Sequence, residues 1–190
     1  MQYQDSFFPL CTERLIIRPL VMADAEPMVR FVTDNREHLA PWEPARTPYY
    51  FSIEYWTQEI AQAREEMFED RSLRLIMVPR DEPEGPVIGR INYNNIVRGV
   101  FQATHLGYAI GAAYEGLGMM AEGLVAANDL MFTKFDLHRI MANYMPNNER
   151  SGALLERIGF VKEGLAKDYL LIAGRWEDHV LTSKINPEHL

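Results

Sequence analysis

Cysteine is almost missing from this chain, since Cys11 is the only one among 190 residues. A single cysteine excludes an intramolecular disulfide and a zinc site built on cysteine pairs. Long apolar runs are also missing, because none approaches the roughly 18 residues that a membrane helix needs. The first ten residues, MQYQDSFFPL, have neither the basic start nor the apolar stretch of a signal peptide. These absences predict a soluble protein of a reducing compartment, the cytoplasm, with no membrane partner.

Positive charge and clustered histidines are scarce as well. The 19 lysines and arginines are outnumbered by 27 aspartates and glutamates, which gives a formal net charge of -8 at pH 7. An acidic surface repels phosphate backbones, so nucleic acid is disfavoured as a partner and a basic polypeptide or a cationic amine is favoured. The five histidines are scattered, with no two at a ligand spacing on one helix, and predict no metal site.

What is present is an ordinary globular composition. Apolar residues make up 47% of the chain and charged residues 24%, which argues against disorder. The length fits one domain, and the chain has no internal repeat or low-complexity stretch. We therefore expect a single domain over residues 1–190.

Hydrophobic periodicity predicts the order of strands and helices. The segment 38–50, HLAPWEPARTPYY, contains three prolines and is expected to be irregular. Ser52 is expected to cap the helix that follows it. The helix at 116–132 is expected to bury Leu117, Met120, Leu124, Ala127 and Met131. Strands are expected at 14–18, 73–78, 87–95, 104–110, 139–144, 161–171 and 175–184, and helices at 24–34, from 52, at 116–132 and at 149–158.

This order of elements predicts a mixed sheet. Strands that follow one another without a helix should pair antiparallel, whereas the helix between 104–110 and 139–144 permits a parallel pair there. The expected fold class is α/β, in the broad sense of an α+β mixed sheet flanked by helices.

A glycine turn precedes the helix at 116–132. The N–H groups of a helix N-terminus form an anion site, and Gly116 and Gly118 would let the backbone approach a phosphate. The structural alternative is simply a tight turn from strand to helix. In the strand before it, small residues on one face, among them Gly107 and Ala109, leave room either for a ligand or for a closely packed helix.

The segment MPNNERSGALLERIG at 145–159 opens the next helix. Asn148 and Ser151 have the spacing of a helix cap, which is the structural interpretation. The functional interpretation is that an amide and a hydroxyl lie together at the carboxyl end of a parallel strand, where α/β proteins bind ligands.

With these pieces in place, the chain resembles the GNAT acyltransferases, and within them the Rim group that acetylates ribosomal proteins. The resemblance extends from about Glu13 to Thr182. It is carried by PWEPAR at 41–46, HRIMANYMPNNERSG at 138–152, GFVKEG at 159–164 and AKDYLLIAGRWEDHVLT at 166–182.

The resemblance implies a GNAT fold with a splay between two parallel strands, and acetyl-CoA as co-substrate. In similar enzymes the pyrophosphate sits on the glycine turn and the pantetheine arm pairs with the strand before it. Asn148 matches a position that binds this arm, and Ser151 matches one proposed to protonate the departing thiolate. The coenzyme contacts implied for this chain are Tyr108, Ile110, Gly116, Leu117, Gly118, Met119, Met120 and Asn148.

Two departures from the family pattern stand out. Ala113 and Leu117 occupy positions that usually carry basic or amide side chains, so the phosphates are expected to rely on backbone N–H groups alone. Leu170 stands where some Rim relatives have a glutamate proposed as the base. Asp168, two residues earlier, is expected on the same face of the strand and is the candidate base.

The expected reaction is direct attack of an amine on the thioester, with Ser151 and Asp168 as catalytic residues. Cys11, with no histidine near it in sequence, is expected to be incidental, so a covalent acetyl-cysteine route is not expected. The resemblance implies the N-terminal alanine of a small-subunit ribosomal protein as the acceptor, with contact to the ribosome or an assembly intermediate left open. Another amine remains an alternative, as does a CoA-binding assembly protein with little catalysis.

Substrate choice is expected in the 38–50 segment and the C-terminal hairpin. Trp42, Glu43 and Tyr49 are the residues expected to line a peptide groove, and acidic side chains there would suit a basic tail. Core packing is the equal alternative for Trp42.

Overall fold

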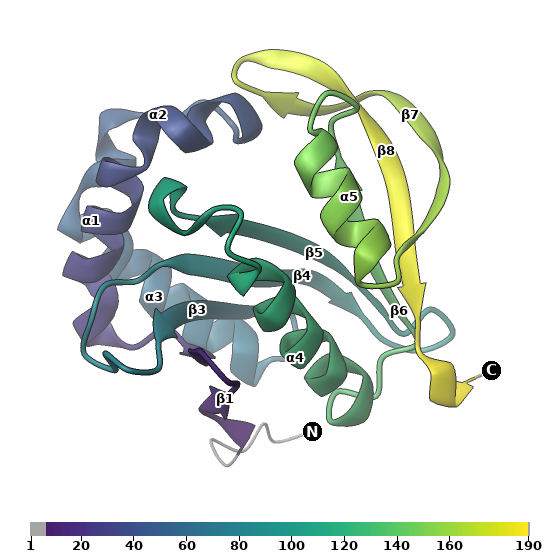
Figure 1. Cartoon of the computed structure of the whole chain (residues 1–190), viewed down its shortest axis with the longest axis horizontal. Helices are drawn as coiled ribbons and strands as arrows, with labels where there is room; N and C mark the ends of the chain where they lie inside the picture. The colour runs from purple at the N-terminus through teal and green to yellow at the C-terminus, as the bar shows by residue number, and fades with distance from the viewer. Residues whose placement is uncertain (1–6, 190) are drawn as a thin grey trace.

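A mixed sheet of eight strands forms the centre of the computed structural model, which describes residues 7–189 (Figure 1). The first six residues, where most of the predicted non-signal N-terminus falls, lie outside the described part. The strand order is β1-β2-β3-β4-β5-β6-β8-β7. The strands are β1 Leu10–Cys11, β2 Leu15–Pro19, β3 Leu73–Pro79, β4 Gly89–Val97, β5 Ala103–Ile110, β6 Arg139–Tyr144, β7 Val161–Ile172 and β8 Arg175–Ile185.

Helices cover both faces of the sheet. One hydrophobic cluster joins α4 and α5 to one face, and a second joins α1 and α3 to the other. The helices are α1 Ala25–Asp34, α2 Arg36–Leu39, α3 Ile53–Phe68, α4 Met119–Thr133 and α5 Glu149–Arg157. Short 3-10 turns lie at η2 Met22–Asp24, η3 Ala40–Trp42, η4 Pro48–Phe51, η5 Ala112–Tyr114 and η6 Pro187–His189.

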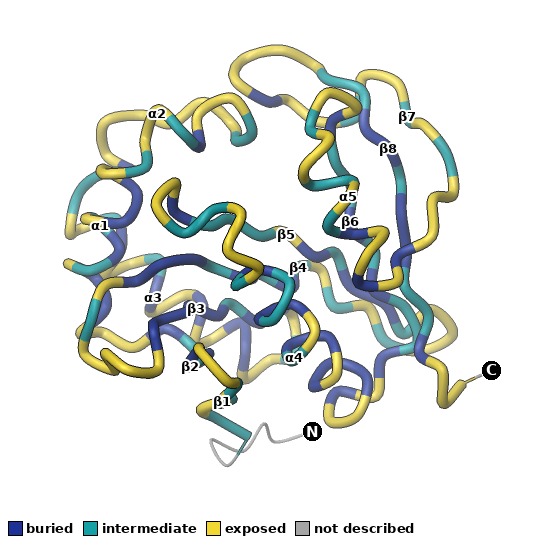
Figure 2. Tube along the Cα trace, in the orientation of Figure 1, coloured by how far each residue is buried: buried dark blue, intermediate teal, exposed yellow. Residues whose placement is uncertain are grey.

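The buried residues follow the predicted periodicity. The α3 stripe of Trp56, Ile60, Ala63 and Met67 is buried, and the Ser52 hydroxyl accepts a hydrogen bond from the Tyr55 N–H as the expected cap. The edge strand β7 is mostly exposed, unlike β3 in the middle of the sheet (Figure 2). No helix in residues 7–189 is both long and apolar enough to cross a membrane.

The parallel pair β5–β6, the one such pair among the described strands, creates an opening in the sheet. β5 and β6 run parallel and pair only from Ala103–Arg139 to His105–Met141. Beyond that point the strands diverge, and the β6 side of residues 106–110 is left unpaired. The predicted parallel pair and its splay are therefore confirmed, as is the antiparallel pairing of the β3–β4, β4–β5 and β7–β8 neighbours.

Two local predictions were wrong. The 38–50 segment is not irregular throughout, because two of its three prolines, Pro41 and Pro48, stand in the first turns of the 3-10 helices η3 and η4, where a missing N–H costs nothing. Leu117 is not in the buried stripe, because α4 begins only at Met119 and leaves Leu117 54% exposed in the turn.

Candidate active site

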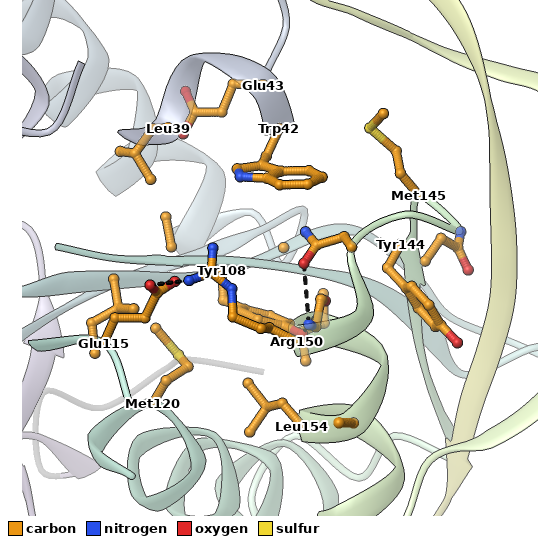
Figure 3. Close-up of a pocket in the computed structure, with 18 of the residues that line it drawn as sticks. Leu39, Trp42, Glu43, Tyr108, Glu115, Met120, Tyr144, Met145, Arg150 and Leu154 are labelled. Atoms are coloured by element: carbon orange, nitrogen blue, oxygen red, sulfur yellow. Dashed lines mark hydrogen bonds and ion pairs between the residues drawn. The ribbon is translucent and has the colours of Figure 1, made fainter. Parts of the chain in front are cut away.

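A cavity of about 530 Å³ opens where β5 and β6 diverge (Figure 3). One part of it, here called the helix side, is bounded by α4 and α5. The other part, the hairpin side, is bounded by η3 and the β7–β8 hairpin. The helix side includes Gly116, Gly118, Met120, Ser151 and Leu154, and the hairpin side includes Trp42, Glu43, Asn143, Leu170 and His179.

The glycine turn presents bare backbone to the helix side. Gly116 and Gly118 have φ of +75° and +77°, the left-handed region that L side chains rarely adopt. Gly118 is the N-cap of α4, and within residues 7–189 no side chain caps this helix. Its first N–H groups are thus free for an anion, aided by the helix dipole. Leu117 and Met119 do not line the cavity with their side chains, so any contact from them is through the backbone.

Arg14, which precedes β2 near the N-terminus, contacts this turn. Its guanidinium donates to the Leu117 carbonyl at 2.9 Å and lies 3.6 Å from where a Cβ on Gly118 would be. It also binds the Glu122 carboxylate at 2.7 Å. Burial acts to raise the pKa of Glu122, but hydrogen bonds from Thr12 and Arg14 outweigh it and lower that pKa. Arg14 is paired with Glu122 and does not line the cavity, so the expectation that the phosphates rely on backbone N–H groups stays a prediction.

Ser151 is held by two neighbours at the start of α5. Its N–H donates to the Asn148 side chain at 3.2 Å, which is the predicted cap. Its Oγ lies 2.6 Å from the Tyr108 hydroxyl on β5. Burial raises the pKa of Tyr108 to about 12, partly offset by the bond to Ser151. Tyr108 therefore stays protonated at neutral pH, and when it donates to Ser151 the serine proton is free to point elsewhere.

Arg150 reaches across the helix side of the cavity to Glu115 (Figure 3). Glu115 directly precedes the glycine turn, and its other oxygen lies 3.8 Å from Nε2 of His38 in α2. Arg150 is exposed, whereas Glu115 is half-buried. The ion pair thus links the N-terminal end of α5 to the turn before α4. Sequence alone did not indicate it, because 35 residues separate the two side chains.

On the hairpin side, Glu43 is already engaged. Its carboxylate binds the largely buried Arg90 and, at 3.3 Å, Arg46. Its carbonyl accepts a hydrogen bond of 2.9 Å from the Ala173 N–H at the hairpin tip. The two segments expected to choose the substrate therefore meet over the cavity. Glu43 lines this wall as predicted, but its charge is neutralised and is not free for a basic tail.

Of the remaining predicted site residues, one lines the cavity and two do not. Trp42 lines the cavity, whereas the Tyr49 hydroxyl donates to Gln58 at 2.8 Å and its side chain lies outside the lining. Asp168 also lies outside it. A register shift between Ala166 and Leu170 in β7, with Asp168 at φ +47°, breaks the alternation that was to place Asp168 on the face of Leu170. That placement was wrong, because Leu170 lines the cavity and Asp168 does not.

The described residues contain no group of three or more histidine, cysteine, aspartate or glutamate side chains placed to hold a metal ion. Cys11 is exposed at β1 and is not part of the cavity.

Comparison with known proteins agrees with this geometry. Residues 14–161 match the acetyltransferase (GNAT) domain family. The chain is 44% identical, over 94% of its length and 91% of the relative's, to the ribosomal protein uS5-alanine N-acetyltransferase of Escherichia coli. It superposes on the solved ribosomal-protein-S5-alanine acetyltransferase of Vibrio fischeri with a TM-score of 0.89, at 41% identity over 94% of this chain and 97% of that one. RimJ of Mycobacterium smegmatis, solved with CoA-disulfide, gives a TM-score of 0.85 at 30% identity over 93% and 83%.

A mixed sheet that splits at its parallel pair, with a bare glycine turn beside the split, is the arrangement of an acyl-CoA-dependent transferase. The chain belongs to the GNAT acetyltransferase family. It is an acetyl-CoA-dependent N-acetyltransferase.

Proposed function

We propose that this protein transfers the acetyl group of acetyl-CoA to the N-terminal α-amine of a ribosomal protein, with the N-terminal alanine of uS5 as the acceptor. The observation that carries the proposal is the 44% identity to the uS5-alanine N-acetyltransferase over nearly the whole chain. The cavity supports it, because its helix side offers an anion site and its hairpin side leaves room for a second substrate. The reaction would take place in the cytoplasm, and contact with the ribosome itself stays a prediction.

The helix side would hold the coenzyme. The free N–H groups at the start of α4 suit the diphosphate, and the unpaired β6 side of residues 106–110 suits the pantetheine amides. When bound there, acetyl-CoA supplies a reactive thioester at the splay. Asn148 and Ser151 stand beside that point at the start of α5.

Ser151 would donate a hydrogen bond, and finally a proton, to the sulfur that leaves. A thiol leaves without much help, because its ordinary pKa is about 8.5. Most of the rate acceleration would therefore come from holding the amine and the thioester in line rather than from acid catalysis.

The test uses purified protein, acetyl-CoA and two peptides, with intact mass as the readout. One peptide carries the uS5 N-terminal sequence with a free alanine, and the other has that amine blocked but keeps its lysines. The expected result is one added acetyl group on the first peptide only. Acetylation of the lysine peptide, or of neither peptide while acetyl-CoA still binds by calorimetry, would overturn the alanine assignment in favour of another amine or a binding role.

A further inference from the structure

His179 is a buried histidine on β8 that lines the hairpin side of the cavity, with only 4% of its surface exposed. β8 pairs with β6 through Tyr144–Val180, which places His179 directly beyond the carboxyl end of β6. This is the end at which β5 and β6 have diverged. No sequence motif pointed to this histidine.

The neighbours of His179 show on which face of the sheet its side chain lies. Tyr144 points toward α5, since a Cβ on Gly152 would lie 2.8 Å from its ring. Alternation along the strands therefore puts Asn143 and His179 on the opposite face, away from α5. Tyr169 connects the two, because its hydroxyl accepts a hydrogen bond from Asn143 at 3.3 Å and its ring lies 5.7 Å from that of His179.

The hydrogen bond of His179 fixes its tautomer. Nδ1 lies 2.9 Å from the Glu177 carbonyl oxygen, and a carbonyl can only accept. The neutral ring must therefore carry its proton on Nδ1, which leaves a lone pair on Nε2. Within residues 7–189 Nε2 has no hydrogen-bond partner. A buried imidazole in a cavity wall, with a fixed tautomer and a free lone pair, is arranged to accept a proton.

We propose that His179 is the base of the acetyl transfer, accepting through Nε2 the proton that the attacking amine must lose. This inference rests on the proposed function. The amine nitrogen forms the new bond to the thioester carbonyl carbon, and the carbon–sulfur bond breaks with its electron pair going to sulfur. The nitrogen of the ammonium form loses two protons, the first to Nε2 before attack and the second, after attack, to the oxygen of Ser151, whose hydroxyl has given its own proton to the sulfur. The imidazolium then returns its proton to water.

The competing carboxylates are less suited to this task. Asp168 is outside the cavity, Glu43 is bound by two arginines, and Leu170 cannot take a proton. Asp178, beside His179, is bound by Lys167 at 2.6 Å. The charged and titratable groups nearest the ring in the hairpin are Lys167, Asp168, Tyr169, Arg175, Glu177 and Asp178. β6 ends in Tyr144, and Glu43 across the cavity brings Arg46 and Arg90.

The experiment compares His179→Gln with wild type and with a matched control, His138→Gln. His138 lies before β6, at the opposite end of that strand from the cavity, stacked on His189. Turnover of the alanine peptide is measured from pH 6.5 to 9 at saturating acetyl-CoA, together with the melting temperature and the Kd for CoA. Ring-nitrogen NMR of the wild type, assigned through the His179→Gln spectrum, reports the tautomer without any need for activity.

We expect His179→Gln to lower kcat about 30- to 100-fold at pH 7, with unchanged CoA binding. The deficit shrinks toward pH 9, because an α-amine with a pKa of about 7.7–8.0 is then already neutral. Added imidazole restores part of the activity of His179→Ala. The control variant behaves as wild type. A folded His179→Gln enzyme with kcat within threefold of wild type, a pH-independent deficit, or an Nε2–H tautomer overturns the inference. Inactivity of the wild type on the peptide instead overturns the proposed function.

Discussion

The contact between Ser151 and Tyr108 bears directly on how the leaving sulfur is handled. Tyr108 is a positioning residue whose effect passes through Ser151, because its hydroxyl touches Oγ at 2.6 Å and its raised pKa keeps it protonated. We expect Ser151→Ala to lower kcat about tenfold, less than a typical general-acid effect because the thiolate leaves readily. Tyr108→Phe should have a smaller effect.

A variant that carries both Ser151→Ala and Tyr108→Phe tests whether Tyr108 acts through Ser151 or only through packing. If Tyr108 acts through Ser151, Tyr108→Phe adds nothing to Ser151→Ala, and steady-state kinetics shows a non-additive cycle. Because Tyr108 stays protonated, its loss leaves the shape of the pH profile unchanged. Fully additive effects would contradict the pairing.

The second residue-scale prediction concerns Glu43, which holds the buried Arg90. Burial alone would lower the pKa of Arg90, but the charge of Glu43 and the Tyr50 hydroxyl raise it. Removing one partner of a buried ion pair leaves the other charge uncompensated. We expect Glu43→Gln to lower the free energy of unfolding by about 2–3 kcal/mol, since Arg90 keeps its bond to Tyr50.

Denaturant unfolding measures this, with Glu26→Gln as the matched control. Glu26 pairs with Arg30 on the surface of α1 with both side chains well exposed, so its loss should cost about 0.5 kcal/mol or less. Equal effects from the two substitutions would show that Glu43 is not a structural anchor.

At the scale of elements, an ion pair between Glu115 and Arg150 links the N-terminal ends of α4 and α5 beside the anion site. The Glu115 carboxylate would repel the phosphates of the coenzyme, and it pairs with Arg150, which could otherwise bind them. We therefore expect Glu115→Gln to tighten CoA binding about three- to tenfold, and Arg150→Gln to weaken it by a similar factor, which is the size of one partly screened charge.

Calorimetry at low salt checks this pair. Glu156→Gln is the control, because it removes the same charge from α5 one turn or more away from Ser151 without touching the cavity lining. Weaker CoA binding by Glu115→Gln would show that the ion pair builds the site rather than competing for it.

The elements were largely predictable because their signals are local. The apolar stripe of α3, the cap at Ser52 and the turn at Ala173–Gly174 each depend on a few adjacent residues, and each prediction agrees with the structure. β1 was missed because a two-residue strand has no period to read. The bulge in β7 was missed for a related reason, since extra residues are invisible in an alternating pattern until the partner strand is placed.

The site was predictable only where its residues follow one another in the chain. The glycine turn and the Asn148–Ser151 pair are contiguous and were identified, whereas Arg14 lies 103 residues from the Leu117 carbonyl that it binds. His179 needed the register of three strands before its neighbours were known. The lone pair on its Nε2 follows from one carbonyl contact, which no sequence pattern encodes.

For the molecule as a whole, the net charge of -8 should favour the encounter with a basic substrate. A basic peptide is attracted over distances of about a Debye length, roughly 10 Å at 0.1 M salt. We expect kcat/KM for a lysine-rich peptide to fall about fivefold between 0.05 and 0.5 M NaCl, mostly through KM. A neutral peptide with the same first residues is the control, and an equal salt response for both would argue against long-range attraction.

The hydrogen bond between the Ala173 N–H and the Glu43 carbonyl joins the tip of the β7–β8 hairpin to the segment after η3, so backbone bridges the hairpin side of the cavity. A bridged wall would admit a free chain end more readily than a lysine within a folded surface, because such a lysine must bring two stretches of backbone to the site. Preference for termini would then follow from access as well as from recognition of the terminal charge. A protein whose first residues are folded against its body would be a poor substrate for the same reason.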